Sequence, residues 1–185
     1  MVAPFGLMSM VREIKPTFRS LIKSILVASI LYYSQQPIVA QDTIDMVRIK
    51  GKPIIVGKLN GKNAYFLVDT GADITILNEV DTKKYKIRYR KTLLKGNMIS
   101  GLISRHERDI WVATNANFYL GNKQMNACFK VLDLSNIKAS IGRKSGVWIN
   151  GIIGSDMMKQ YDFIIDYGTR QVRFTHLESA SNTCL

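Results

Sequence analysis

Short apolar runs separated by turn residues dominate the chain beyond residue 40. The runs that we expect to form strands are residues 53–59, 64–69, 85–89, 109–120, 124–134, 161–167 and 171–177. The first two runs flank Asn60-Gly61, a pair that suits a tight hairpin turn with positive φ. Only Ser155–Tyr161 has a helical pattern. Many short strands at hairpin spacing predict an all-β fold, either a barrel or a sandwich.

The first forty residues follow a different pattern. Four basic residues come first: Arg12, Lys15, Arg19 and Lys23. An apolar run of ten residues, 24–33, follows, and then a polar stretch that ends at Ala40. This order is typical of a secretory signal peptide. Ten helical residues reach about 15 Å, half of a hydrocarbon core of about 30 Å, so a membrane anchor would need the flanking residues as well.

We therefore expect residues 1–40 to be a signal peptide or an N-terminal membrane anchor, with an ordinary amphipathic helix as a third interpretation. Residues 41–185 then form one domain, exported to the periplasm or the extracellular space. Membrane association through residues 1–40 stays open.

The formal net charge of +12 changes this picture little. It would suit an acidic substrate, an anionic membrane surface or nucleic acid. The basic residues are spread along the chain, with one cluster at 83–95, and no nucleic-acid-binding motif accompanies them. We predict no nucleic-acid partner and interpret most of the charge as a solvated surface. Cys128 and Cys184 lack the spacing of a metal site and could pair in an exported chain.

The candidate chemistry starts where an apolar strand, residues 66–68, ends on Asp69. A carboxylate is expensive to bury, so a turn would hold it at the strand's end. Gly71 permits close backbone approach there, Ala72 keeps the site small, and a second apolar run, 74–77, returns the chain to the core. This arrangement would hold the carboxylate rigidly.

Two further segments accompany this loop. Trp148–Tyr161 carries two apolar residues between Gly151 and Gly154, followed by a short helix for which Ser155 or Asp156 would be the N-cap. Between the two motifs, residues 95–111 place Gly96 and Gly101 around a small apolar tip. Such a hairpin is the kind of segment used as a lid.

Together these segments resemble the retropepsin-like aspartic proteases, and especially the exported bacterial members of that family. The resemblance rests on residues 66–77, 97–101 and 149–174, and it spans 49–174. It implies a retropepsin-like closed β-barrel with one short C-terminal helix and an active site at a homodimer interface. It also implies an aspartic endopeptidase with a peptide or protein substrate, without cofactor or metal.

The resemblance assigns roles to the residues of the first motif. Asp69 would carry the catalytic carboxylate, Thr70 would hydrogen-bond to its counterpart across the site, and Gly71 would offer backbone groups to the pair of acids. The residues that would bind substrate are Ala72, Asp73, Met98, Ile99, Ser100, Gly101 and Ile152, with residues 98–101 as the flap.

In the second motif the resemblance implies structural support. Gly151 and Gly154 would pack beneath the active-site loop, and Asp156 would cap the helix that follows. The viral members carry an arginine where this chain has Ser155. Asp73 would therefore need another partner, such as a cation of the other subunit, and the dimer could depend on substrate.

The catalytic motif occurs once in the chain. Asp166, followed by Tyr-Gly, lacks the threonine and lies in a predicted hairpin. A mechanism in which two carboxylates share one proton thus requires two chains, and a C2 homodimer follows. Two alternatives stay open: a catalytically inactive peptide-binding domain of the same fold, and a membrane-tethered processing protease.

Overall fold

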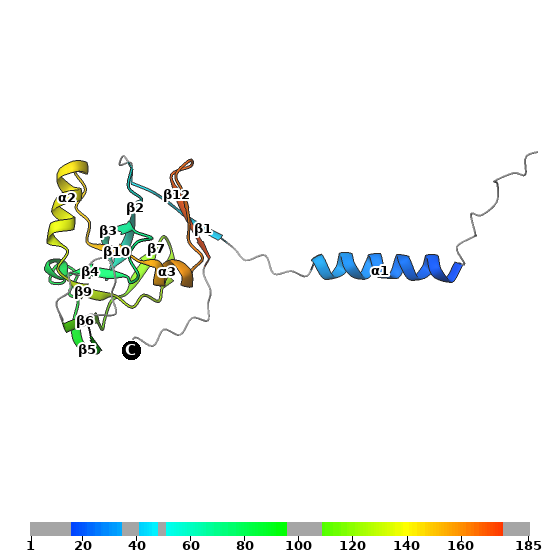
Figure 1. Ribbon diagram of the computed structural model, residues 1–185, viewed down its shortest axis with the longest axis horizontal. Helices are drawn as coiled ribbons and strands as arrows, with labels where there is room; N and C mark the ends of the chain where they lie inside the picture. Colours follow the sequence, from blue (N-terminus) through cyan, green and yellow to red (C-terminus); the bar gives the residue numbers. More distant parts are fainter. Residues whose placement is uncertain (1–15, 35–40, 48–50, 96–108, 176–185) are drawn as a thin grey trace, which may run out of the picture. The chain divides into compact units, whose positions relative to one another are not determined.

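Two separate units make up the chain in the computed structural model, residues 1–39 and residues 40–185. The structure describes residues 16–34, 41–47, 51–95 and 109–175. The first unit contains the helix α1 (Pro16–Ser34), in which apolar side chains such as Leu26 are exposed (Figure 1). Among the described helices, none combines the length and apolar character needed to cross a bilayer.

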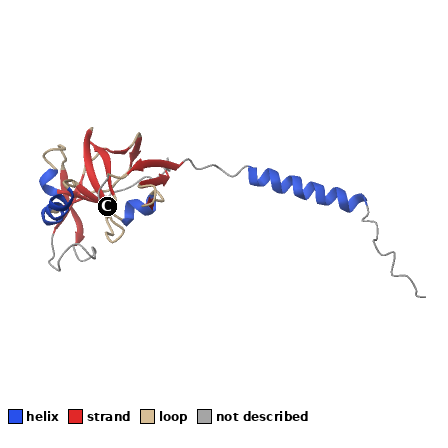
Figure 2. Cartoon of the chain, turned by 90° about the horizontal axis from the view of Figure 1, so that it is seen from above, coloured by secondary structure: helices blue, strands red, loops and turns tan. Residues whose placement is uncertain are grey.

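Strands account for most of the second unit, as Figure 2 shows. They are β1 (Gln41–Asp45), β2 (Ile54–Leu59), β3 (Lys62–Val68), β4 (Ile76–Asn78), β5 (Tyr89–Lys95), β6 (Asp109–Ala113), β7 (Phe118–Leu120), β8 (Lys123–Met125), β9 (Lys130–Leu132), β10 (Gly151–Ile153), β11 (Ile164–Asp166) and β12 (Gln171–Thr175). The helical elements of this unit are a 3-10 turn, η1 (Glu79–Asp81), and the helices α2 (Ser135–Ser145) and α3 (Ser155–Gln160).

The strands form two sheets. The larger has the order β5-β6-β9-β4-β10-β3-β2-β7-β8, and the smaller has the order β1-β12-β11. The all-β prediction is confirmed. The predicted closed barrel is wrong for the described residues, because closure needs a continuous hydrogen-bonded ladder, and here β5 and β8 are the two edges of the larger sheet.

The hairpin between β2 and β3 forms as predicted. Asn60 and Gly61 have φ angles of 47° and 79°, the left-handed conformation that this turn requires. The six-residue ladder from Ile54↔Leu67 to Leu59↔Lys62 then fixes which residues of β3 face the core. Because β3 leads directly into Asp69, this hairpin sets the position of the candidate catalytic loop.

Some predictions of secondary structure are wrong. The runs 109–120 and 124–134 are each divided into two strands, β6 with β7 and β8 with β9. Residues 85–88 do not form a strand: Lys86 has a φ of 53° at the end of a turn, β5 begins only at Tyr89, and the segment buries Tyr85 and Ile87. The helix α2 was not predicted, because Gly142 lies inside it and glycine disfavours helices. That glycine makes room for the indole of Trp148, whose ring atoms would lie 2.6 Å from an added Cβ.

The core of this unit has two parts. The larger cluster includes Phe66, Phe118 and Phe129, with ring centroids 4.8–5.8 Å apart. The second cluster joins side chains of β2, β3, β4 and β10 to residues 134–149; its buried members are Ile54, Leu67, Ala72, Ile76, Leu134, Ile141, Ile149 and Ile152. Ala72 belongs to the candidate loop, so this second cluster anchors the loop to the sheet and to α2.

Cys128 is disulfide-bonded. Cys184, the other cysteine of the chain, lies outside the described residues.

Candidate active site

Asp69 follows the last residue of β3, and its main chain is fixed on both sides. Its N–H donates to the carbonyl of Ile153 at 3.0 Å, and its own carbonyl accepts the N–H of Ala72 at 3.1 Å. The carboxylate accepts the N–H of Gly71 at 3.0 Å. The side chain of Asp69 is half-buried, whereas Thr70 and Gly71 are exposed. The loop therefore presents a carboxylate at the surface from a rigid base.

The strand β10 lies between the two arms of this loop. It pairs in parallel with β3, where Ile153 is opposite Val68, and antiparallel with β4, where Ile152 is opposite Ile76. A Cβ at Gly151 would press on the carbonyl of Ile76 and on the ring of Phe66 at 2.7 Å. Only a glycine fits here, and this explains the first glycine of the motif.

Gly154, the second glycine, passes directly beneath the returning arm of the loop. A Cβ there would meet the backbone of Ile74, including its nitrogen at 2.9 Å, and backbone atoms cannot move aside as a flexible side chain can. Gly154 is also the N-cap residue of α3 and makes no side-chain cap bond. The expectation that Ser155 or Asp156 is the N-cap is wrong, because Ser155 is already the first residue of the helix and the N-cap is the residue before it.

Asp156 instead ties the helix to the loop. Its carboxylate accepts the N–H of Thr75 at 3.0 Å and the hydroxyl of Thr75 at 2.7 Å, and also the N–H of Met157 at 2.7 Å. The hydroxyl of Thr75, which is buried, accepts the N–H of Gly154 at 3.1 Å. A single pair of side chains thus joins β4, the second glycine and α3.

The main chain completes this connection. Ser155 donates its N–H to the carbonyl of Ala72 at 2.7 Å, and Asp156 donates to the carbonyl of Asp73 at 3.3 Å. The hydroxyl of Ser155 also reaches the carbonyl of Asp73, at 3.4 Å. Ser155 therefore bonds to the candidate loop through both its main chain and its hydroxyl.

The predicted substrate-binding residues fall into three groups. Asp73 is exposed beside the candidate carboxylate, whereas Ala72 and Ile152 are buried in the second core cluster. The flap residues Met98, Ile99, Ser100 and Gly101 lie outside the described residues.

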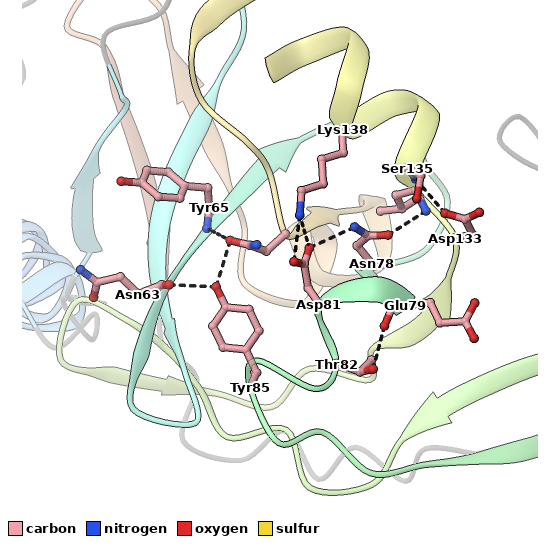
Figure 3. Close-up of polar contacts among 12 residues, drawn as sticks. Asn63, Tyr65, Asn78, Glu79, Asp81, Thr82, Tyr85, Asp133, Ser135 and Lys138 are labelled. Carbon is pink, nitrogen blue, oxygen red and sulfur yellow. Dashed lines mark hydrogen bonds and ion pairs between the residues drawn. The ribbon is translucent and has the colours of Figure 1, made fainter. Parts of the chain in front are cut away.

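Behind the site, the structure contains a polar network that sequence reasoning did not predict (Figure 3). Its centre is Asn150, the residue before β10, which is buried. The side-chain oxygen of Asn150 accepts the N–H of Tyr65 and the hydroxyl of Tyr85, both at 3.0 Å. Burial raises the pKa of the Tyr85 phenol. The main chain of Asn150 bonds to the carbonyl of Tyr65 at 2.7 Å and to the N–H of Asn78 at 2.9 Å.

The same network extends to α2. Lys138 donates to both carboxylate oxygens of Asp81, at 2.8 and 2.7 Å, and Asn78 donates to one of them at 3.0 Å. Asn78 in turn accepts the N–H of Leu134 at 2.9 Å. The only sequence signal is the pair of asparagines next to apolar runs, because Asp81 and Lys138 are far apart in the chain.

Asp166, the other candidate acid, serves as a turn residue. It accepts the N–H groups of Gly168 at 2.9 Å and Thr169 at 3.0 Å. The hydrogen bonds from Thr169 are the main reason why its pKa is lowered, and Gly168 and Arg173 act in the same direction. These bonds agree with the interpretation of Asp166 as a hairpin residue.

Comparison with known proteins agrees with the resemblance to aspartic proteases. A family profile described as aspartyl protease matches residues 55–157. No curated protein matches the chain.

Three solved structures are similar, each at low sequence identity. A retropepsin-like aspartic protease from Rickettsia conorii is 18% identical, covering 74% of this chain and 91% of that one, with a TM-score of 0.44. The EIAV protease in complex with the inhibitor HBY-793 is 16% identical (62% and 92% covered, TM-score 0.40). The retroviral protease-like domain of Ddi1 from Leishmania major is 15% identical (69% and 96% covered, TM-score 0.41).

Proposed function

The chain belongs to the aspartyl protease family, as its resemblance to the retropepsin-like proteases indicated, and on that premise we propose that it is a homodimeric aspartic endopeptidase. Each of two copies contributes Asp69 to a shared site. The observation that carries the proposal is the fixed Asp69 loop, with one half-buried carboxylate at the end of a buried strand.

The chemistry follows from two carboxylates that share one proton. Like charges a few ångströms apart do not both ionise, so one acid is protonated and the other is not. The ionised carboxylate takes a proton from a water molecule, whose oxygen attacks the peptide carbonyl carbon, while the protonated one donates to the carbonyl oxygen. The tetrahedral intermediate then collapses as the C–N bond breaks and the amine nitrogen takes up a proton.

The dimer is required because one chain supplies one Asp-Thr-Gly. Thr70 and Gly71 are exposed at the tip of the loop, so both are accessible to a second copy related by a twofold axis. The resemblance assigns Asp73, which is also exposed, to binding the backbone of an extended peptide.

The first test is hydrolysis of a mixed peptide library, read by mass spectrometry. We expect Asp69→Asn to lose cleavage by at least about a thousandfold, because removing an essential catalytic group has effects of this size. The matched control is Asp166→Asn, which changes another aspartate near a glycine but keeps an oxygen for its turn, and it should retain wild-type cleavage. Unchanged cleavage in Asp69→Asn would refute the proposal. If the wild-type protein binds peptides without cleaving them, the chain is instead a catalytically inactive peptide-binding domain.

The second test is the oligomeric state. Analytical ultracentrifugation over a range of concentrations, with and without a hydroxyl-bearing peptide inhibitor, should reveal a dimer at least in the presence of the inhibitor. A chain that stays monomeric when saturated with the inhibitor could not supply the second acid.

Export is a further part of the proposal. The basic and apolar pattern of residues 1–40 supports it, with removal of this segment or retention as an anchor as the two outcomes. Intact-mass measurement of the protein from the producing cell distinguishes them, and a full-length chain recovered entirely from the cytoplasm would contradict export.

A further inference from the structure

One row of paired residues crosses the larger sheet from the hairpin β2–β3 to the strand β5. Its members are neighbours in the strand register, and residues paired in this way place their side chains on the same face. In order across the sheet they are Ile54, Leu67, Ile152, Ile76, Lys130, Val112 and Arg90.

The first four members show which face this is. All four are buried in the second core cluster, together with Ala72 of the candidate loop. The row therefore lies on the side of the sheet to which the loop is attached. It changes in character after Ile76: two of the next three residues, Lys130 and Arg90, are basic.

Lys130 is the unusual member of the row. It is half-buried, and its ammonium group makes no hydrogen bond or ion pair with any residue in the described ranges. Its main-chain N–H is used, since it donates to the carbonyl of Thr75 at 3.0 Å. Burial lowers the pKa of Lys130; the negative charge of Asp156 opposes this change and the positive charge of Arg90 adds to it.

No nearby carboxylate among the described residues forms an ion pair with the ammonium group of Lys130. Asp156 is the nearby carboxylate, but it already accepts three hydrogen bonds, two from Thr75 and one from Met157. A partly buried ammonium group to which the described part of the chain offers no hydrogen-bond or ion-pair partner favours an anion from outside.

Building on the proposed function, we propose that Lys130, with Arg90 beside it in the row, selects peptide substrates that carry an acidic side chain near the scissile bond. Lys130 is then a specificity-determining residue.

The geometry of the sheet limits where that acidic side chain lies. Lys130 is on β9, three strands from β3 in the order β3-β10-β4-β9. Strands are about 4.8 Å apart, so the separation is roughly 14 Å. An extended peptide advances about 3.3 Å per residue, and the lysine side chain shortens the distance. The acidic residue should therefore lie about two to four positions from the scissile bond.

The experiment measures selectivity rather than rate. Pairs of peptides with an apolar centre, identical except for Glu or Gln at one flanking position, compete in one tube with the full-length protein at a pH near 6. The ratio of their kcat/KM values does not depend on how much of a variant is folded. For wild type we expect the Glu peptide to be preferred at one position in the expected range.

Lys130→Met should lower that ratio about tenfold, as expected for the loss of one charge-assisted contact. The matched control is Lys58→Met, since Lys58 is exposed on β2 and pairs with Asn63 at the opposite end of the hairpin from the loop. An unchanged ratio in Lys130→Met, or an equal fall in Lys58→Met, would overturn the inference.

A binding measurement separates this inference from the proposed function. The same fluorescent peptide pairs are titrated against Asp69→Asn, alone and combined with Lys130→Met, and followed by anisotropy. A Glu preference in binding that depends on Lys130 supports the inference even if wild type cleaves nothing, in which case only the proposed hydrolysis fails. Cleavage that depends on Asp69 with no Glu preference leaves the function standing and refutes the role of Lys130.

Discussion

The connection between Asp156 and Thr75 offers the sharpest test of how the loop is held. We expect Thr75→Val to destabilise the protein although valine has nearly the same shape as threonine. The substitution removes one hydroxyl, which donates to the Asp156 carboxylate at 2.7 Å and accepts the N–H of Gly154 at 3.1 Å.

The magnitude follows from those two bonds. A hydrogen bond to a charged group contributes about 1.5–3 kcal/mol, and a buried N–H left without an acceptor costs about 1–3 kcal/mol. Because the two effects share one site and are not additive, the expected loss is about 2–5 kcal/mol of unfolding free energy. That is a large part of the roughly 5–15 kcal/mol that keeps a domain folded.

The assay is urea unfolding followed by circular dichroism, at two protein concentrations because the proposed dimerisation would add to stability. Thr75→Ser is the control; it keeps the hydroxyl and should lose less than about 1.5 kcal/mol. On a peptide substrate, Thr75→Val should also lower kcat/KM, since the loop carries Asp69. A loss below about 1 kcal/mol in Thr75→Val, or the same loss in Thr75→Ser, would show that this connection does not hold the loop.

Three more predictions follow from individual contacts. Gly154→Ala should lose more than about 2 kcal/mol of stability, or fail to fold, because the added Cβ presses on the backbone of Ile74; a soluble variant with wild-type Tm would contradict this. Lys138→Met should cost about 1–3 kcal/mol in thermal unfolding, since it removes two of the three hydrogen bonds to the Asp81 carboxylate in a pair that is mostly shielded from solvent. Adding Asp81→Asn should recover part of the loss, and a further loss instead would count against the pair. Lys130→Met should be at least as stable as wild type near neutral pH, with a Tm about 1–3 °C higher, because burial lowers the pKa of this lysine when the chain folds. Between the lowered pKa and the ordinary lysine pKa of 10.5, the unfolded chain binds more protons than the folded one, so the wild-type protein gains stability as the pH rises. The difference in stability between wild type and Lys130→Met should therefore narrow over that range. A constant difference would refute the reasoning.

Local signals were sufficient to predict the hairpin and the loop that carries Asp69. The turn Asn60-Gly61 has one favourable geometry, and the apolar run of β3 can end on a carboxylate only where solvent reaches it. The structural role of Gly151 and Gly154 in the second motif could also be predicted, because close packing against the backbone leaves no space for a Cβ. These features depend on a few neighbouring residues.

Features that depend on distant residues were not predicted. The buried position of Asn150 requires Tyr65 and Tyr85 as donors, and neither tyrosine is near it in sequence. The helix α2 has weak local propensity and is held by packing in the second core cluster and by Lys138. For residues 85–88, the alternation of buried and exposed side chains comes from a turn and the irregular segment after it rather than from a strand, so the period alone was misleading.

The hydrogen bonds that hold the loop have a consequence for the proposed dimer. Hydrogen bonds to Ile153, Ala72, Gly71 and Asp156 within one chain hold the described main chain of residues 69–75, so we expect each half of the proposed site to keep its shape in a separated subunit. If the proposed dimer is the active form, dilution should abolish peptide cleavage by separating folded subunits, and reconcentration should restore the cleavage at once.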